Sequence, residues 1–380
     1  MTQKSIVIAA YKRTPFTRAY KGDLVNVRSD DFGAQLVRGL VAHTKIDPTT
    51  IEDLIVGCAF PEAEQGFNVG RLMVLLAGLD IRVAGVTVNR FCGSSMQSIH
   101  IAAGNIMMGA GEAYICAGIE SMSHVPMTGF NPMPNPYLLE HMPSALIGMG
   151  ETAENLAKKY KIDRNTQDTF AALSHQKAAK AQAEGRFKDE IIPIKDGKKT
   201  YEVDGCIRAD TTADGLAALE PAFAKGGSVT AGTSSPLTDG ASAVLVCTEE
   251  YAQKYKLEPL ARIRSIAVSG CAPEIMGIGP VGATKKALQR AGLTLDDIDI
   301  VELNEAFAAQ SLAVIQELKI PVEKLNLDGG AIALGHPLGA SGARITGKAA
   351  QLLKREKGQY ALATMCIGGG QGIATVLEAL

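Results

Sequence analysis

Short apolar segments alternate with longer stretches of helical periodicity along most of the chain. The apolar segments are continuous rather than alternating with polar residues, and they fall at residues 5–10, 55–58, 86–88, 113–116, 298–301 and 360–363. Continuous apolar runs of this length are typical of strands that are buried on both faces of a sheet. The pattern therefore predicts an α/β protein with a buried sheet.

Two parts of the chain resemble each other. Residues 51–54 (Ile-Glu-Asp-Leu) match residues 295–298 (Leu-Asp-Asp-Ile) at an offset of 244 positions. The same offset sets the apolar run 86–88 against residues 330–332, and it sets Cys92 against His336. We therefore expect an internal duplication in which these two side chains occupy equivalent positions.

A long insertion interrupts the first repeat. In the second repeat a strand at 360–367 runs through a glycine turn into a last strand at 373–377. The matching last strand of the first repeat, at 240–245, follows only after a detour that contains amphipathic helical stretches at 152–160 and 166–184. We expect a first half at 1–120 with 232–250, an inserted loop domain at 121–231 that covers a site, and a second half at 251–380.

Composition narrows the classes of function. Lys and Arg total 38 against 40 Asp and Glu, and no basic run occurs, so nucleic acid is not an expected partner. The seven cysteines are scattered without a Cys-x-x-Cys pair, which argues against a disulfide framework and a structural metal site. We expect no signal peptide at Met1–Lys4, no membrane span and a cytoplasmic location.

Two residues carry the strongest chemical signals. Cys92 lies between an apolar run and a helical stretch, where the N-terminus of a helix favours a thiolate and is expected to lower the pKa of the thiol. His336 is the single histidine of residues 251–380 and lies in a glycine-rich segment that allows close approach of another chain segment or a ligand. The pair predicts nucleophilic catalysis in which His336 activates Cys92.

For other candidate residues the sequence leaves a functional and a structural interpretation open. Cys366 precedes a glycine run, so that it is either a second active thiol or a buried filler. Asn304 ends an apolar strand and is either functional or the N-cap of the next helix. Residues 277–282 satisfy G-x-G-x-x-G, but they do not directly follow a strand and Pro280 has no N–H for a pyrophosphate, so an NAD-dependent oxidoreductase is not favoured.

Four motifs in this order resemble the thiolases over essentially the whole chain. They are Asn-Arg-Phe-Cys-Gly-Ser-Ser-Met at 89–96, Asn-Glu-Ala-Phe-Ala at 304–308, Gly-His-Pro-Leu-Gly at 335–339 and Cys-Ile-Gly-Gly-Gly-Gln-Gly at 366–372. The resemblance implies a duplicated five-layered α-β-α-β-α fold with an inserted loop domain. It also implies that Cys92 accepts an acyl group, that His336 activates it, and that His336 and a water on Asn304 bind a thioester oxygen. Cys366 would be a second acid/base, and the N–H groups of Cys92 and Gly368 would form another oxyanion hole.

The same resemblance implies a reaction and a ligand. The expected reaction is ping-pong cleavage of 3-ketoacyl-CoA by CoA, with no cofactor and with CoA as a substrate. Family positions for CoA map onto Arg208 for the nucleotide, Leu216 beside the adenine, Ala231 and Ser235 along the pantetheine, and Met149 near the thioester. The resemblance also implies a homodimer or homotetramer, with a hydratase/dehydrogenase partner subunit as an open alternative.

The subtype rests on two places in the insertion. Residues 123–127 read Ser-His-Val-Pro-Met, and Gly148 stands where biosynthetic acetoacetyl-CoA thiolases tend to have His. Both features are similar to the degradative 3-ketoacyl-CoA thiolases of fatty acid β-oxidation. Synthesis of acetoacetyl-CoA by the same residues remains the nearest alternative, and a non-catalytic CoA-binding subunit is disfavoured because no catalytic position is missing.

Overall fold

Two half-sheets of the same strand order meet at their edges in this protein. The structure is a computed structural model that describes residues 4–380; Met1–Gln3, where the sequence argues against a signal peptide, lie outside the described residues. In the first half the order is β4-β3-β5-β8-β1, and in the second half it is β10-β11-β12-β9. The halves join where β1 pairs with β9 at Val7↔Arg262 and Ile8↔Ala261, so the two half-sheets form one continuous sheet.

The strand bounds agree closely with the apolar segments of the sequence. In the first half they are β1 (Ile6–Arg13), β2 (Thr17–Arg18), which pairs with β8, β3 (Asp53–Gly57), β4 (Ala84–Val88), β5 (Ala113–Ser121) and β8 (Thr238–Thr248). In the second half they are β9 (Ala261–Gly270), β10 (Ile300–Leu303), β11 (Tyr360–Ile367) and β12 (Gln371–Glu378). In both halves a parallel pair (β3 and β5, β10 and β11) is followed by an antiparallel pair (β5 and β8, β11 and β12), which is the expected duplication.

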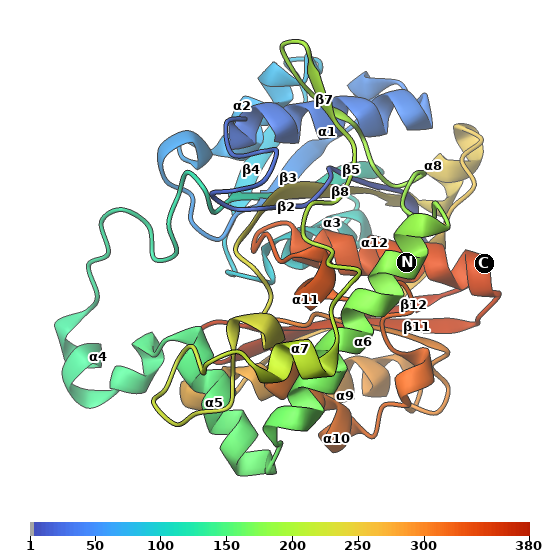
Figure 1. Cartoon of the computed structure of the whole chain (residues 1–380). Coiled ribbons are helices and arrows are strands. Elements are labelled where there is room, and N and C mark those ends of the chain that lie inside the picture. Colours follow the sequence, from blue (N-terminus) through green and yellow to red (C-terminus); the bar gives the residue numbers. More distant parts are fainter. Residues whose placement is uncertain (1–3) are drawn as a thin grey trace.

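Helices separate and cover the two half-sheets (Figure 1). Helices α3 (Ser94–Met107) and α12 (Ser341–Glu356) lie between them, α1 (Ser29–Thr44) and α2 (Val69–Leu76) cover the first half, and α9 (Gly279–Ala291) and α10 (Ala308–Leu318) cover the second. Each interface has its own cluster of buried apolar side chains. The predicted five-layered α-β-α-β-α fold is confirmed. Two short helices, α8 (Glu249–Lys254) and α11 (Ala331–Leu334), complete the halves.

Three details of the predicted duplication are wrong. Strand β4 is an edge strand with partly exposed residues, including Val86 at 37% exposure, rather than a buried strand. Residues 330–332, its predicted counterpart, begin helix α11 because the second half replaces the strand with a single bridge from Val301 to Leu325. Helices α3 and α12 begin 247 positions apart, so His336 lies three residues earlier in its loop than Cys92 does.

Residues between β5 and β8 leave the sheet and pack beside the second half. They contain α4 (Pro136–His141), α5 (Met149–Tyr160), α6 (Arg164–Ala183), α7 (Ala213–Ala217) and the hairpin of β6 (Ile194–Asp196) and β7 (Lys199–Tyr201). In Figure 1, α5, α6 and α7 lie against the second half, whereas α4 stands away from the body. No helix among residues 4–380 is long and apolar enough to span a membrane.

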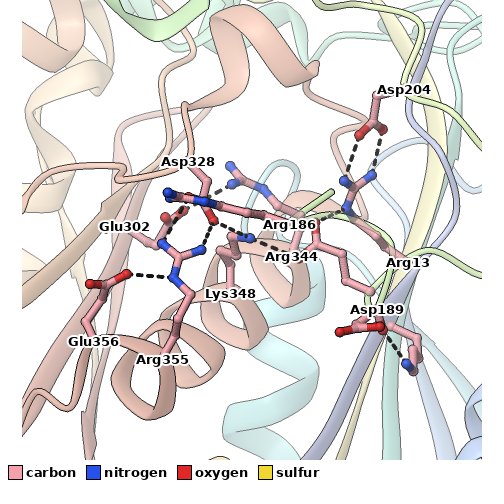
Figure 2. A network of polar contacts seen from close by, with 12 residues as sticks. Arg13, Arg186, Asp189, Asp204, Glu302, Asp328, Arg344, Lys348, Arg355 and Glu356 are labelled. Carbon is pink, nitrogen blue, oxygen red and sulfur yellow. Dashed lines mark hydrogen bonds and ion pairs between the residues drawn. The ribbon is translucent and has the colours of Figure 1, made fainter. Parts of the chain in front are cut away.

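A buried charge network fastens this segment to both halves (Figure 2). Arg13 of β1 pairs with Glu190 and Asp204 of the segment. Lys348 of α12 pairs with the same Glu190 and with Asp328. Removing one member of such a buried network leaves the opposite charge unpaired at high cost, so the network holds the segment in one position.

The G-x-G-x-x-G run has a packing role. Its first glycine lies in the short turn Pro273–Ile278, and Gly279 begins α9. A Cβ atom on Gly279 would lie 2.1 Å from the carbonyl oxygen of Gln371, so glycine is needed for α9 to pack on β12. The run is therefore occupied by contacts within the protein and does not support a dinucleotide site.

Candidate active site

Cys92 lies in a tight turn directly before helix α3. Phe91 has a left-handed φ of 42°, which is unusual for a bulky residue and marks a constrained turn. The hydroxyl of Ser94 donates to the carbonyl of Phe91 at 2.6 Å and accepts the N–H of Arg90 at 2.9 Å. These bonds hold the thiol at the N-terminus of α3, where the sequence predicted it.

The expectation of a low pKa for Cys92 is wrong. Burial raises the pKa of its thiol to about 11, although the backbone N–H groups of Gly368 and of Cys92 itself act in the opposite direction. Burial dominates because the free-energy cost of removing a thiolate from water is larger than the stabilisation that the two N–H groups provide. Cys92 is therefore a neutral thiol at rest and needs a base, while the two N–H groups near its sulfur are suitable as an oxyanion hole.

His336 presents an unprotonated nitrogen to the site. Its Nδ1 lies 2.5 Å from the hydroxyl oxygen of Ser341, which itself donates to the carbonyl of Pro337 at 3.0 Å. Since that hydroxyl has already used its proton, Nδ1 carries the hydrogen and Nε2 keeps its lone pair. Burial, and then the charge of Arg344, lower the pKa of His336 to about 3, so the imidazole is neutral. A neutral imidazole with an unprotonated Nε2 is able to accept the proton of Cys92.

Asn304 faces His336 rather than capping a helix. Its Nδ2 lies 3.3 Å from Nε2 of His336, and its Oδ1 is buried without a protein partner. Helix α10 begins four residues later with Phe307 as its N-cap, so the N-cap interpretation is wrong. An amide with a buried, unpaired oxygen next to the imidazole fits the water-holding role that the resemblance implies.

One cavity of about 390 Å³ brings the predicted residues together. Cys92, His336 and Cys366 line it with Met149 and Ser235. Burial raises the pKa of Cys366 well above its usual range, and the neighbouring Cys92 raises it further. The rest of the wall is largely apolar, with Met122, Met127, Phe223, Leu237, Phe307 and Leu338. The cavity therefore holds two neutral thiols and a neutral base in a setting suitable for an apolar chain.

A second, smaller cavity continues from the first. Arg208 and Ala231 line it, and Ser234 and Pro236 line both cavities. A Cβ atom on Gly368 would lie 3.4 Å from the sulfur of Met149, which puts this residue beside the larger cavity. Leu216 is buried in α7 and lines neither cavity. The structure thus places the predicted catalytic residues in or beside the larger cavity and Arg208 and Ala231 on the smaller one, with Leu216 packed beside Gly232.

The family models "Thiolase, N-terminal domain" and "Thiolase, C-terminal domain" match residues 6–250 and 257–379. The chain belongs to the thiolase family. It is 49% identical to a 3-ketoacyl-CoA thiolase of Bacillus subtilis, with 99% of each chain covered, and 50% identical to one of Marinobacter nauticus, with 100% of this chain and 99% of the relative covered.

Solved structures of thiolases have the same fold. Human mitochondrial 3-ketoacyl-CoA thiolase in complex with CoA matches with a TM-score of 0.92 and 40% identity over 100% of this chain and 98% of the human chain. Bacillus anthracis acetyl-CoA acetyltransferase matches with a TM-score of 0.91 and 39% identity over 100% of this chain and 99% of the other.

Sequence reasoning missed a carboxylate that positions the His336 loop. Glu120 at the end of β5 accepts the N–H of Gly339 at 2.8 Å and the N–H of Ala59 at 2.8 Å. A Cβ atom on Gly118 would lie only 2.1 Å from the carbonyl oxygen of Gly339, so the loop packs directly on the backbone of β5. No motif signals this contact, because it joins residues that are more than 200 positions apart.

Sequence reasoning also missed a second arginine. Arg18 lines the smaller cavity with Arg208, and neither makes an ion pair within the part of the chain that the structure describes. Burial lowers the pKa of Arg208, and the positive charge of Arg18 lowers it further, against the weaker opposite effect of Asp210. His175 lies against Arg208, with Nδ1 at 3.2 Å from its backbone nitrogen and Nε2 at 3.2 Å from its Nη2. The two arginines, without carboxylate partners among the described residues, suit an anion.

The arrangement predicts different roles for the two cavity thiols. After mixing with acetyl-CoA, intact mass should show one acetyl group on the wild type and on Cys366→Ala, and none on Cys92→Ala. Cleavage of acetoacetyl-CoA by Cys366→Ala should fall by the roughly 10²–10⁴-fold typical of a lost acid/base. An acetyl group on Cys92→Ala, or near-normal cleavage by Cys366→Ala, would contradict these roles.

Proposed function

We propose that this chain is a 3-ketoacyl-CoA thiolase that uses CoA to cleave 3-ketoacyl-CoA into acetyl-CoA and a shortened acyl-CoA. The observation that carries the proposal is the cavity that Cys92, His336 with its unprotonated Nε2, and Cys366 line together. The relatives named 3-ketoacyl-CoA thiolase, at 49–50% identity over nearly the whole chain, support the same reaction.

The first half-reaction transfers the acyl group to Cys92. Nε2 of His336 takes the thiol proton, and the sulfur attacks the 3-keto carbon, whose oxygen is held by the N–H groups of Cys92 and Gly368. The bond between C2 and C3 then breaks, and its electron pair forms the enolate of acetyl-CoA. His336, now protonated, and Asn304 with its water stabilise the enolate oxygen, and Cys366 protonates C2.

The second half-reaction returns the enzyme to its initial state. The Cys366 thiolate takes the proton of an incoming CoA thiol, and the CoA sulfur attacks the acyl group on Cys92. The shortened acyl-CoA leaves, and the Cys92 sulfur recovers its proton from His336. Every proton is exchanged between residues of the cavity and the substrates, so the cycle requires no cofactor.

The nearest alternative is condensation of two acetyl-CoA molecules to acetoacetyl-CoA by the same residues. The similarity to an acetyl-CoA acetyltransferase structure favours it. The relatives named 3-ketoacyl-CoA thiolase, at 49–50% identity, and the apolar wall of the cavity favour the degradative direction, with a role in fatty acid β-oxidation. We also propose a cytoplasmic location. A hydratase/dehydrogenase partner that supplies the 3-keto group is part of this proposal.

Acyl chain length tests the proposal. We expect thiolysis of medium-length 3-ketoacyl-CoAs as well as acetoacetyl-CoA, because the cavity wall contributes methionine, leucine and phenylalanine side chains beyond the thiols. The measurement is kcat/KM for CoA-dependent cleavage across a series of chain lengths. Activity confined to acetoacetyl-CoA would support the biosynthetic alternative, and no thiolysis at any length would refute the proposed function.

Arg18 and Arg208 should bind the phosphates of CoA. We expect Arg18→Met to raise KM for CoA about tenfold with little change in kcat, since a partly exposed charge-assisted contact is worth about 1.4 kcal/mol. Arg82→Met is the matched control, because Arg82 is an exposed arginine that pairs with Asp80 away from both cavities. An equal KM in Arg18→Met and wild type would exclude this contact.

Assembly should cover the exposed edge of the first half. Strand β4 is an edge, and Phe67, Leu75 and Ile81 near it are 93%, 49% and 75% exposed. Unpaired edges and apolar patches of this kind favour pairing with another copy, so we propose a homodimer or a dimer of dimers. Light scattering should give an active mass that is a multiple of 39.9 kDa, and an active monomer would contradict it.

A further inference from the structure

Two buried arginines of the charge network are neutralised to different degrees (Figure 2). Arg13 binds both oxygens of Asp204, at 2.6 and 2.7 Å, and its Nε donates to Glu190 at 2.8 Å. Arg344 has a single partner, Oε2 of Glu302, which lies 3.0 Å from its Nη1. Nε and Nη2 of Arg344 and Oε1 of Glu302 have no partner among the described residues.

The protonation of Glu302 weakens this pairing further. Burial raises the pKa of Glu302 to about 7, against the opposite effects of Arg344 and Lys348. Its carboxyl is therefore not fully ionised at neutral pH. Arg344, which is 2% exposed, keeps an incompletely compensated positive charge inside the protein.

This charge lies on the same two elements that hold His336. Ser341, which binds Nδ1 of the imidazole, is one turn before Arg344 on the same face of α12. Asn304, which faces Nε2, directly follows β10 and is two residues after Glu302, on the same side of the extended chain. The Glu302–Arg344 contact therefore runs parallel to the contacts among Asn304, His336 and Ser341. From the rise per residue of the helix and the extended chain, the two sets of contacts are about 5–7 Å apart.

We infer that Glu302 and Arg344 are a positioning pair for the catalytic base: the guanidinium adds to burial in disfavouring the protonated form of His336, and the carboxylate sets the size of that addition. The inference deepens the proposed function, because an uncharged His336 is what that mechanism requires. Neither residue lines the substrate cavity, so both act through His336.

The other ionisable groups around His336 leave this role to Arg344. Cys92 at α3 and Cys366 of β11 are neutral thiols at rest. Glu120 of β5 accepts N–H groups of Ala59 and Gly339, and burial raises its pKa. Lys348, one turn beyond Arg344 on α12, is neutralised by Glu190 and Asp328. Glu305, which directly follows Asn304, accepts hydrogen bonds from Ser174 and Asn326, and burial raises its pKa. Arg344 is the charge that lowers the pKa of His336 beyond the effect of burial.

The pair should therefore control the reactivity of resting Cys92. Transfer of the thiol proton to Nε2 gives a thiolate–imidazolium pair, and its population rises tenfold for each unit by which the pKa of His336 rises. Removing the Arg344 charge should raise that population. Removing the Glu302 charge should lower it, because Arg344 then acts unopposed.

Alkylation of Cys92 by iodoacetamide, followed by intact mass on the full chain, measures this population without any thiolase substrate. We expect Arg344→Met to react at least about tenfold faster than wild type at pH 7.5, since a nearby charge shifts a pKa by one to three units. Arg344→Lys should react at the wild-type rate. Glu302→Gln should equal wild type below about pH 6 and be slower by about threefold above about pH 8, with the ratio changing near the pKa of Glu302.

Arg355→Met is the matched control. It removes a charge from the last turn of the same helix, where Arg355 pairs with Asp328, and should leave the alkylation rate unchanged. Thermal melting shows which variants fold. If Arg344→Met does not fold, the inference is tested by the ratio of the alkylation rates of Glu302→Gln and wild type as a function of pH. Unchanged rates, or rates that shift in the same direction in Arg344→Met and Glu302→Gln, would overturn the inference whether or not thiolysis is observed.

Discussion

The site depends on direct contact between the backbones of the two halves. The loop that carries His336 belongs to the second half, yet its Gly339 rests on Gly118 of the first-half strand β5, where a side chain on either would collide. The glycines allow the two backbones to approach closely. Glu120 then accepts the N–H of the same Gly339, and this hydrogen bond holds the loop in place. Because α3 and α12 lie side by side between the half-sheets, this contact brings the start of each helix to one cavity, and with it Cys92 and His336.

Burial determines the chemistry of that cavity more than the helix terminus does. The thiol of Cys92 and the imidazole of His336 are both held uncharged, with pKa values of about 11 and about 3. Charge therefore develops only when a substrate carbonyl accepts the sulfur, and the N–H groups of Cys92 and Gly368 are already in position to stabilise it. A site of this kind limits reaction with stray electrophiles, since the reactive thiolate is scarce until the acyl-CoA arrives.

The sequence was sufficient where local pattern decides the structure. Apolar runs located most strands, and motifs located the residues that line the cavity, because both signals are continuous along the chain. Sequence-based prediction failed where contacts between residues far apart in the chain determine the structure. The strand β4 reads as buried from its composition, but its exposure follows from its place at the edge of the sheet. The pKa of Cys92, the side-chain direction of Asn304 and the closeness of Arg18 to Arg208 all depend on contacts between separate elements, which no local pattern records.

The charge network that joins Arg13, Glu190, Lys348 and Asp328 has a consequence for how such an enzyme diversifies. The inserted segment is anchored at Glu190 and Asp204 to β1 and α12, and these ion pairs hold that part of it against the two halves. Because the anchor lies outside the cavity wall, side chains of the wall such as Met127, Phe223 or Leu237 can be exchanged without disturbing it. Adaptation to longer or shorter fatty acids is then expected to proceed by such exchanges while the anchor stays the same.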